Sequence, residues 1–180
     1  MKRAIFLDRD GVLNLAINRE RKPYPPRNVS EVVILPGVEK ALQLLRTAKF
    51  ELVVVTNQPD VSRGTSTMKE VNVINTYISN LLNLENFFIC YHDDSDQCDC
   101  RKPKPGLLMQ AAINLDIELT ASYMVGDRWR DIAAGQEAGC KSYFIDYKYD
   151  EPRPKSSYIP VTSLLEAAQH ILEVEKHAKS

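Results

Sequence analysis

The stretch Phe6-Leu7-Asp8-Arg9-Asp10-Gly11-Val12-Leu13-Asn14 places two carboxylates one residue apart where an apolar run ends. If Ile5 to Leu7 end a buried strand, Asp8 and Asp10 stand at its carboxyl end, where open α/β sheets bind ligands. One carboxylate of such a pair can attack phosphorus while the other moves the leaving group's proton, and a divalent ion can bridge both to phosphate oxygens. An acidic turn, a calcium loop or a sugar-nucleotide metal site has a similar local sequence, so the motif alone leaves these alternatives open.

Outward from this stretch, apolar runs typical of buried strands alternate with amphipathic segments. The predicted strands are 4–7, 51–56, 87–90, 123–125 and 142–145, and the predicted helices are 38–48, 68–82, 105–115 and 163–176. Such alternation implies parallel strands joined by crossover helices, so we expect an α/β three-layer sandwich with a mainly parallel, Rossmann-like sheet. Ser163 is the expected N-cap of the last helix, with Glu166 at the capping-box position. Segments 22–27 and 150–154 are predicted to be loops.

Length and charge limit the possible functions. The chain has 180 residues, 44% of them hydrophobic, which is enough for one core, so we expect residues 1–180 to form a single domain. With 23 basic and 24 acidic residues, bulk charge indicates neither a nucleic-acid nor a membrane partner. The sequence contains neither a long apolar run nor a signal-peptide pattern, so we expect a cytoplasmic protein. Separately, we expect the protein to be a monomer.

Polar side chains also follow two later strands. Thr56, Asn57 and Gln58 close the second predicted strand, where the threonine hydroxyl could donate to a phosphate oxygen. Strand termination and a turn are the alternative role of these residues. Gly126-Asp127 closes another strand, and Asp127 would suit magnesium, which prefers carboxylate oxygen. The alternative is that Asp127 is an N-cap and Asp131 a surface residue.

A basic cluster, Arg101-Lys102-Pro103-Lys104-Pro105-Gly106, precedes a predicted helix. A lysine here can neutralise charge on a transferring phosphoryl group, and an arginine can bind phosphate or hydroxyl oxygens through its planar fork. A solvated basic loop is the alternative.

Taken in this order, the motifs resemble the four signature motifs of the haloacid dehalogenase superfamily of phosphotransferases: Asp8-x-Asp10-Gly11, Thr56-Asn57, Lys102 and Gly126-Asp127-x-x-x-Asp131. More narrowly, Phe-Leu-Asp-Arg-Asp-Gly, Val-Val-Val-Thr-Asn-Gln and Cys-Asp-Cys-Arg-Lys-Pro-Lys-Pro-Gly resemble the D-glycero-D-manno-heptose 1,7-bisphosphate phosphatases, with the histidinol-phosphate phosphatases as close relatives. The resemblance extends from about residue 2 to residue 147. Pro59-Asp60 departs from the family's commoner Ser-Gly, and segment 15–27 matches poorly.

The resemblance implies a role for each matching residue. Asp8 would be the nucleophile that forms an aspartyl-phosphate, and Asp10 would protonate the leaving oxygen and later deprotonate water. Magnesium would be held by the Asp8 carboxylate, the Asp10 backbone carbonyl and Asp127. Thr56 and Lys102 would hold the phosphoryl oxygens. Substrate contacts would come from Asn57, Gln58, Arg101 and Arg128.

The cysteines give a separate signal. Three thiols and one imidazole lie within eleven residues, a set suited to a closed tetrahedral zinc site: Cys90, His92, Cys98 and Cys100. Because no ligand position remains for water, we expect the zinc to be structural and to fix the chain directly before Arg101. Segment 90–100 also resembles the zinc loop of the heptose bisphosphate phosphatases, with a shorter gap after His92. Cys140 is expected in the core, whereas His170 and His177 are expected to be solvated.

Two function classes follow from these patterns. The first is a magnesium-dependent phosphatase acting on heptose 1,7-bisphosphate at its 7-phosphate, with histidinol phosphate or another small phosphorylated metabolite as alternatives. The second is a binding module whose zinc loop recognises a partner and whose phosphatase fold is inactive. The presence of Asp8, Asp10, Lys102 and Asp127 together favours the enzyme. Since the chain has no room for a large cap domain, loops and the zinc region are expected to shape the pocket.

Overall fold

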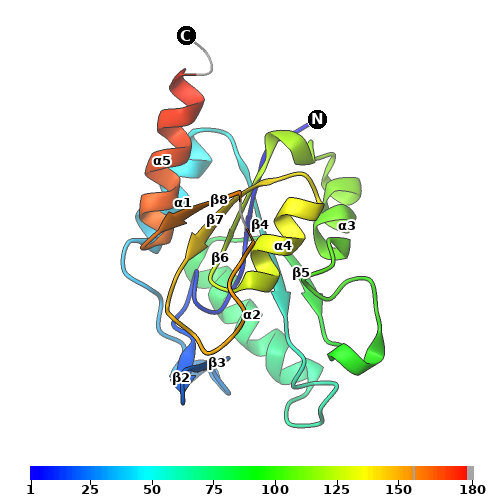
Figure 1. Cartoon of the computed structure of the whole chain (residues 1–180). Helices are drawn as coiled ribbons and strands as arrows, with labels where there is room; N and C mark the ends of the chain where they lie inside the picture. The colour runs from blue at the N-terminus through cyan, green and yellow to red at the C-terminus, as the bar shows by residue number, and fades with distance from the viewer. Residues whose placement is uncertain (156, 178–180) are drawn as a thin grey trace.

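The computed structural model describes residues 1–155 and 157–177. Its centre is a six-stranded sheet in which every neighbouring pair is parallel (Figure 1). In spatial order the strands are β5 (Asn86–Cys90), β4 (Glu51–Asn57), β1 (Ala4–Leu7), β6 (Tyr123–Gly126), β7 (Lys141–Ile145) and β8 (Tyr158–Val161). The helices are α1 (Val38–Thr47), α2 (Met68–Leu82), α3 (Gly106–Leu115), α4 (Trp129–Glu137) and α5 (Leu164–His177), with 3-10 turns η1 (Val29–Glu31), η2 (Asp94–Asp96) and η3 (Leu119–Ala121).

The helices cover both faces of the sheet, which gives the expected three layers. Successive side chains of β1 point to opposite faces. Ile5 and Leu7 join a hydrophobic core with α1, α2 and α5, whereas Ala4 and Phe6 join a second core with α3 and α4. Because both faces are covered, all four residues of β1 are fully buried, as expected for a central parallel strand.

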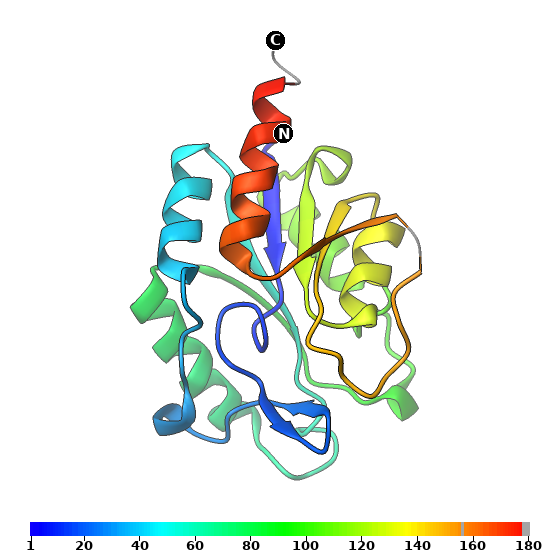
Figure 2. The same ribbon diagram turned by 60° about the vertical axis from the view of Figure 1, so that its left-hand side comes forward.

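The strand order places a topological switch beside β1. The chain passes from β1 to β4 and β5 on one side and then crosses to β6, β7 and β8 on the other. Ligands of open α/β sheets bind outside the carboxyl ends of the strands at such a point. A short antiparallel hairpin, β2 (Ile17–Arg19) and β3 (Lys22–Tyr24), lies at this end, opposite the two chain termini (Figure 2). Among the described residues, no helix is long and apolar enough to cross a membrane.

The five predicted strands and four predicted helices are confirmed to within a few residues. The loop predicted for 22–27 is wrong at Lys22–Tyr24, which forms β3; a three-residue strand containing Pro23 shows too little alternation to be detected. Strand β8 was not predicted, because Pro160 is unfavourable in a strand interior and is tolerated here at the sheet edge.

The C-terminal helix begins one residue later than predicted. The Glu166 amide donates to Ser163 Oγ at 3.1 Å, so Ser163 is the N-cap as predicted. The Glu166 carboxylate, however, accepts from the Thr162 amide, so it does not complete a capping box with Ser163.

The prediction that His170 is solvated is wrong: its ring packs against Tyr143, with Nδ1 2.9 Å from the phenol oxygen. Cys140 is buried in the core and His177 is exposed, as expected.

Candidate active site

Three neighbouring strands deliver the predicted motifs to one place. Leu7 at the end of β1 is paired with Val54 of β4 and Val125 of β6, so the residues that follow these strands are close. Asp8 follows β1 directly and Asp127 follows β6, whereas Thr56 is the second-last residue of β4. The Asp8 amide donates to the Val125 carbonyl at 3.1 Å, which continues the sheet by one residue and fixes the backbone of Asp8.

Lys102 reaches this group from the loop before α3. The side chain is fully buried, and its ammonium contacts Asp8 Oδ1 at 2.8 Å, Asp131 Oδ1 at 2.6 Å and the Val55 carbonyl at 2.7 Å. These three acceptors match the three donors of an ammonium group. Burial opposes the charged form, but the carboxylates of Asp131 and Asp8 more than offset that effect and raise the pKa of Lys102. Lys102 is therefore a fixed cation.

Three buried carboxylates surround that cation. Asp8, Asp127 and Asp131 each offer one oxygen, and these atoms all lie within 4.8 Å of one another. Burial, with the charge of Asp131, raises the pKa of Asp8 to about 6 even though Lys102 lowers it. Burial and the charges of Asp8 and Asp131 raise the pKa of Asp127 well above its ordinary range.

The charge of this cluster fits a divalent cation. Three carboxylates share the single ammonium of Lys102, so two negative charges remain uncompensated when all are ionised. Asp127 Oδ1 is buried and has no hydrogen-bond partner among the described residues. Hard divalent ions such as magnesium bind carboxylate oxygens of this kind. The carboxylates present could therefore hold magnesium.

The hydrogen bonds of the Asp10 carboxylate go to residues outside this cluster. Its carboxylate accepts from Arg9 Nη2 at 3.0 Å, from Asn14 Nδ2 at 2.9 Å and from Gln58 Nε2 at 2.9 Å. Arg9 is fully buried, and its other terminal nitrogen donates to Asn75 of α2 at 2.8 Å. These contacts hold the Asp10 carboxylate in one orientation while it still lines the cleft. The predicted metal contact of Asp10 concerns its backbone carbonyl and stays a prediction.

Polar residues at the end of β4 and directly after it support the site. Gln58 donates to Thr56 Oγ1 at 2.9 Å, and both side chains are buried. Asn57 donates to the Lys102 carbonyl at 3.0 Å and accepts from the Lys102 amide at 3.1 Å, so it fixes the backbone of the lysine loop. The predicted substrate contacts of Asn57 and Gln58 stay predictions; the contacts seen here orient Lys102 and Asp10.

The four predicted zinc ligands come together. The sulfur atoms of the three cysteines and Nδ1 of His92 all lie within 4.8 Å of one another: Cys90, His92, Cys98 and Cys100. The separations range from 3.1 Å between the sulfurs of Cys100 and Cys90 to 3.7 Å between those of Cys90 and Cys98. Ligand atoms about 2.3 Å from one tetrahedral ion lie roughly 3.7 Å apart. Donor type and spacing therefore fit zinc.

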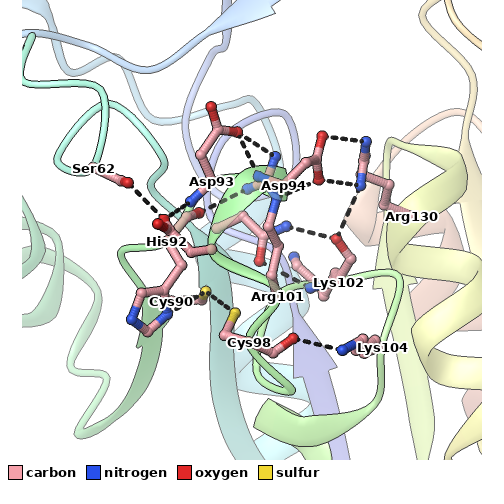
Figure 3. Close-up of polar contacts among 12 residues, drawn as sticks. Ser62, Cys90, His92, Asp93, Asp94, Cys98, Arg101, Lys102, Lys104 and Arg130 are labelled. Atoms are coloured by element: carbon pink, nitrogen blue, oxygen red, sulfur yellow. Dashed lines mark hydrogen bonds and ion pairs between the residues drawn. The ribbon is translucent and has the colours of Figure 1, made fainter.

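Ion pairs connect the zinc loop to the cleft. Figure 3 shows Arg101 and Arg130 converging on Asp94 of η2, with Arg101 Nε at 2.8 Å and two Arg130 nitrogens at 3.1 Å. Asp93, the residue before Asp94, accepts hydrogen bonds from Arg63 at both of its carboxylate oxygens, and these bonds lower the pKa of Asp93 to about 2. The loop between His92 and Cys98, although short, thus positions arginines from three segments.

The cleft itself has a volume of about 290 Å³ and contains Asp8, Asp10 and Lys102. Its rim carries basic side chains from the hairpin, the β4–α2 connection, the zinc loop and the start of α4: Lys22, Arg63, Arg101, Arg128 and Arg130. Arg128 is paired with Glu151 through Nε at 2.8 Å. The predicted substrate residues Arg101 and Arg128 both line the cleft. Acidic side chains lie beside the basic ones on the rim, namely Asp60, Asp94, Asp150 and Glu151, and several of them pair with the arginines. The basic side chains are the groups that could contact an anionic ligand.

Several residues of the site were not singled out from the sequence. Asp131 was quoted only within a motif, yet its Oδ2 accepts from the amides of Asp127 and Arg128 while its Oδ1 contacts Lys102, so it is neither exposed nor a surface residue. Its position four residues after Asp127 was the available signal. Arg9 could have been suspected from its place between two aspartates, whereas no local pattern pointed to Arg130.

Comparisons with known proteins agree with this geometry. A model of the haloacid dehalogenase-like hydrolase family matches residues 26–139. The chain is 31% identical over 191 residues, covering all of both chains, to a Pasteurella multocida protein named D-glycero-beta-D-manno-heptose-1,7-bisphosphate 7-phosphatase. It is 33% identical over 149 residues to a Helicobacter pylori (strain J99) protein of the same name, covering 79% of this chain and 82% of the relative.

A solved structure is similar over nearly the full length. It is a D,D-heptose 1.7-bisphosphate phosphatase from B. bronchiseptica complexed with magnesium and phosphate, with a TM-score of 0.84 and 29% identity. The match covers 97% of this chain and 99% of that one. Among the described residues, the only strands outside the central sheet are those of the short hairpin β2–β3, so the described part of the chain has no large cap domain.

Proposed function

The chain belongs to the haloacid dehalogenase-like hydrolases and is a phosphoric monoester hydrolase, and we propose that it uses magnesium to hydrolyse D-glycero-D-manno-heptose 1,7-bisphosphate at the 7-phosphate. The observation that carries this proposal is the direct contact of Lys102 with Asp8 and Asp131 in the carboxylate cluster that includes Asp127. The shared name of the two relatives supports the substrate. We also propose that residues 1–180 form a single phosphatase domain.

In this proposal Asp8 attacks phosphorus, an aspartyl-phosphate forms, and the bond to the sugar oxygen breaks. Lys102 stabilises the negative charge that develops on the phosphoryl oxygens, because its ammonium is fixed beside the nucleophile. Asp127 and Asp131 would hold magnesium together with Asp8, and the ion would neutralise phosphate charge and orient the phosphoryl group. Thr56 accepts from Gln58, which leaves its own hydroxyl proton available to a phosphoryl oxygen.

Asp10 gives its proton to the leaving sugar oxygen and then accepts one from the water that hydrolyses the aspartyl-phosphate. Arg9, Asn14 and Gln58 keep its carboxylate from rotating between these two steps. We further propose that zinc bound by the four cysteine and histidine ligands fixes the chain before Arg101. The rim arginines would then recognise the second phosphate of the substrate.

A substrate panel tests the proposal. Purified protein with magnesium is assayed for kcat/KM on heptose 1,7-bisphosphate, on heptose 7-phosphate and on histidinol phosphate, with Asp8→Asn as the inactive control. We expect kcat/KM for the bisphosphate to be at least tenfold higher than for either monophosphate, because only the bisphosphate has a second phosphate to contact the basic side chains of the rim. A preference for histidinol phosphate would reject the substrate assignment, and full activity of Asp8→Asn would reject the nucleophile.

A further inference from the structure

The connection between β7 and β8 runs beside the carboxylate cluster and contributes side chains to it. Tyr149 Oη donates to Asp127 Oδ2 at 2.9 Å, and Tyr147 Oη donates to the Gly11 carbonyl at 2.9 Å. The two rings lie 5.6 Å apart, centroid to centroid. Figure 2 shows this connection, coloured orange, reaching the same end of the sheet as the hairpin β2–β3. No motif in the sequence indicated these tyrosines.

We propose that Tyr149 is a positioning residue for magnesium: its hydroxyl fixes the Asp127 carboxylate so that one oxygen is held by the protein and the other is presented to the ion. The inference rests on the proposed function, because it assigns a role within the same metal site. It adds a residue from a segment outside the four motifs.

The two oxygens of Asp127 are in different situations. Oδ2 receives the Tyr149 hydroxyl, whereas Oδ1 is buried without a hydrogen-bond partner among the described residues. A buried carboxylate oxygen without a donor costs free energy unless a cation meets it. The Tyr149 bond therefore divides the carboxylate into one oxygen held by the protein and one available for coordination.

The packing on the other side of Asp127 restricts the same carboxylate. A Cβ placed on Gly11 would lie 1.9 Å from Asp127 Oδ2, so the carboxylate rests directly against the glycine backbone. Tyr147 holds the Gly11 carbonyl from the same segment that carries Tyr149. Asp127 is thus enclosed between the glycine and the tyrosine hydroxyl, and loss of the hydroxyl frees one side only.

The segment is itself fastened at further points. Glu151 accepts from Arg128, the residue after Asp127, and the Asp150 amide donates to the Arg21 carbonyl at 2.8 Å. Tyr149 lies directly before these two anchors, so its ring is not free to leave the site. Hydrogen bonds that orient a metal-binding carboxylate typically change metal affinity by about 10- to 100-fold.

The test compares two matched variants, Tyr149→Phe and Tyr147→Phe, each of which removes one hydroxyl from the same segment. Magnesium binding is measured by isothermal titration calorimetry without substrate, and the magnesium dependence of kcat is measured with substrate. We expect Tyr149→Phe to raise the magnesium Kd by about tenfold or more while kcat at saturating magnesium stays within about threefold. Tyr147→Phe is expected to leave the magnesium Kd within about twofold.

Two outcomes overturn the inference about Tyr149. The first is an unchanged magnesium Kd in Tyr149→Phe, and the second is an equal rise in both variants, which would assign the effect to the anchoring of the segment. Asp127→Asn separates this failure from failure of the proposed function. If Asp127→Asn loses magnesium and Tyr149→Phe does not, only the role of Tyr149 is wrong; if Asp127→Asn binds magnesium as wild type does, the metal site itself is wrong.

Discussion

We expect the variant Asp8→Asn, which replaces the proposed nucleophile, to become more stable relative to the wild-type protein as the pH rises, when both are free of magnesium. Burial and the Asp131 carboxylate raise the pKa of Asp8 from 3.8 to about 6. The stability that its protonated form contributes is therefore fully present below pH 3.8 and is lost as the pH rises through about 6. At pH 8 the full shift corresponds to a cost of about 3 kcal/mol, of which roughly half is already present at pH 5.

The contact with Lys102 lowers the pKa of Asp8 and is already included in the value of about 6, so its free energy is not added again. The Asp8 charge also raises the pKa of Asp127, so its removal changes the pH dependence in the same direction. Relative to wild type, Asp8→Asn should gain on the order of 1–2 kcal/mol of stability from pH 5 to pH 8, or roughly 3–6 °C in melting temperature. Thermal unfolding in magnesium-free buffer measures it, with the exposed Asp116→Asn as control. A difference from wild type that is the same at both pH values would refute the reasoning.

Three other substitutions test the metal sites and the lysine. Cys98→Ser should lose zinc by elemental analysis and melt at a lower temperature, whereas Cys140→Ser, which removes a buried thiol outside the cluster, should keep it. Gly11→Ala should weaken magnesium binding in calorimetry at least tenfold, because its Cβ would overlap a metal-binding carboxylate, whereas Gly64→Ala, with open space around its Cβ, should not. Lys102→Met should lower kcat by about 10² or more in a phosphate-release assay, with unchanged kcat contradicting a role in charge stabilisation.

Local sequence patterns were sufficient for five of the six strands of the sheet and for most of the motif residues. Apolar runs predicted β1, β4 and β6, and a polar residue after each run predicted a shared ligand site, because parallel neighbours end at the same edge. The same reasoning could not identify Tyr149 or Arg130. Tyr149 reaches Asp127 across 22 residues and Arg130 reaches Asp94 across 36, and side-chain contacts of this kind depend on the tertiary fold.

For some residues that were assigned a direct role in substrate binding, the structure adds contacts that the sequence did not predict. Asn57 and Gln58 stand at the end of a strand, so a ligand contact was the simplest interpretation. Their amides also hold the Lys102 backbone and the Asp10 carboxylate, and the predicted substrate contacts stay predictions. A strand end can only suggest that a side chain faces the ligand edge; which acceptor it reaches depends on loops that pack there from elsewhere in the chain.

The two candidate metal centres have different physical roles. The carboxylate cluster carries an excess of two negative charges when ionised, so binding of a cation there relieves repulsion and, since the pKa of Asp8 is raised to about 6, releases protons. The cysteine cluster lies in a loop whose Asp94 holds Arg101 and Arg130 at the cleft. Loss of magnesium should therefore abolish turnover while the rim stays in place, whereas loss of zinc should first weaken substrate binding through the arginines.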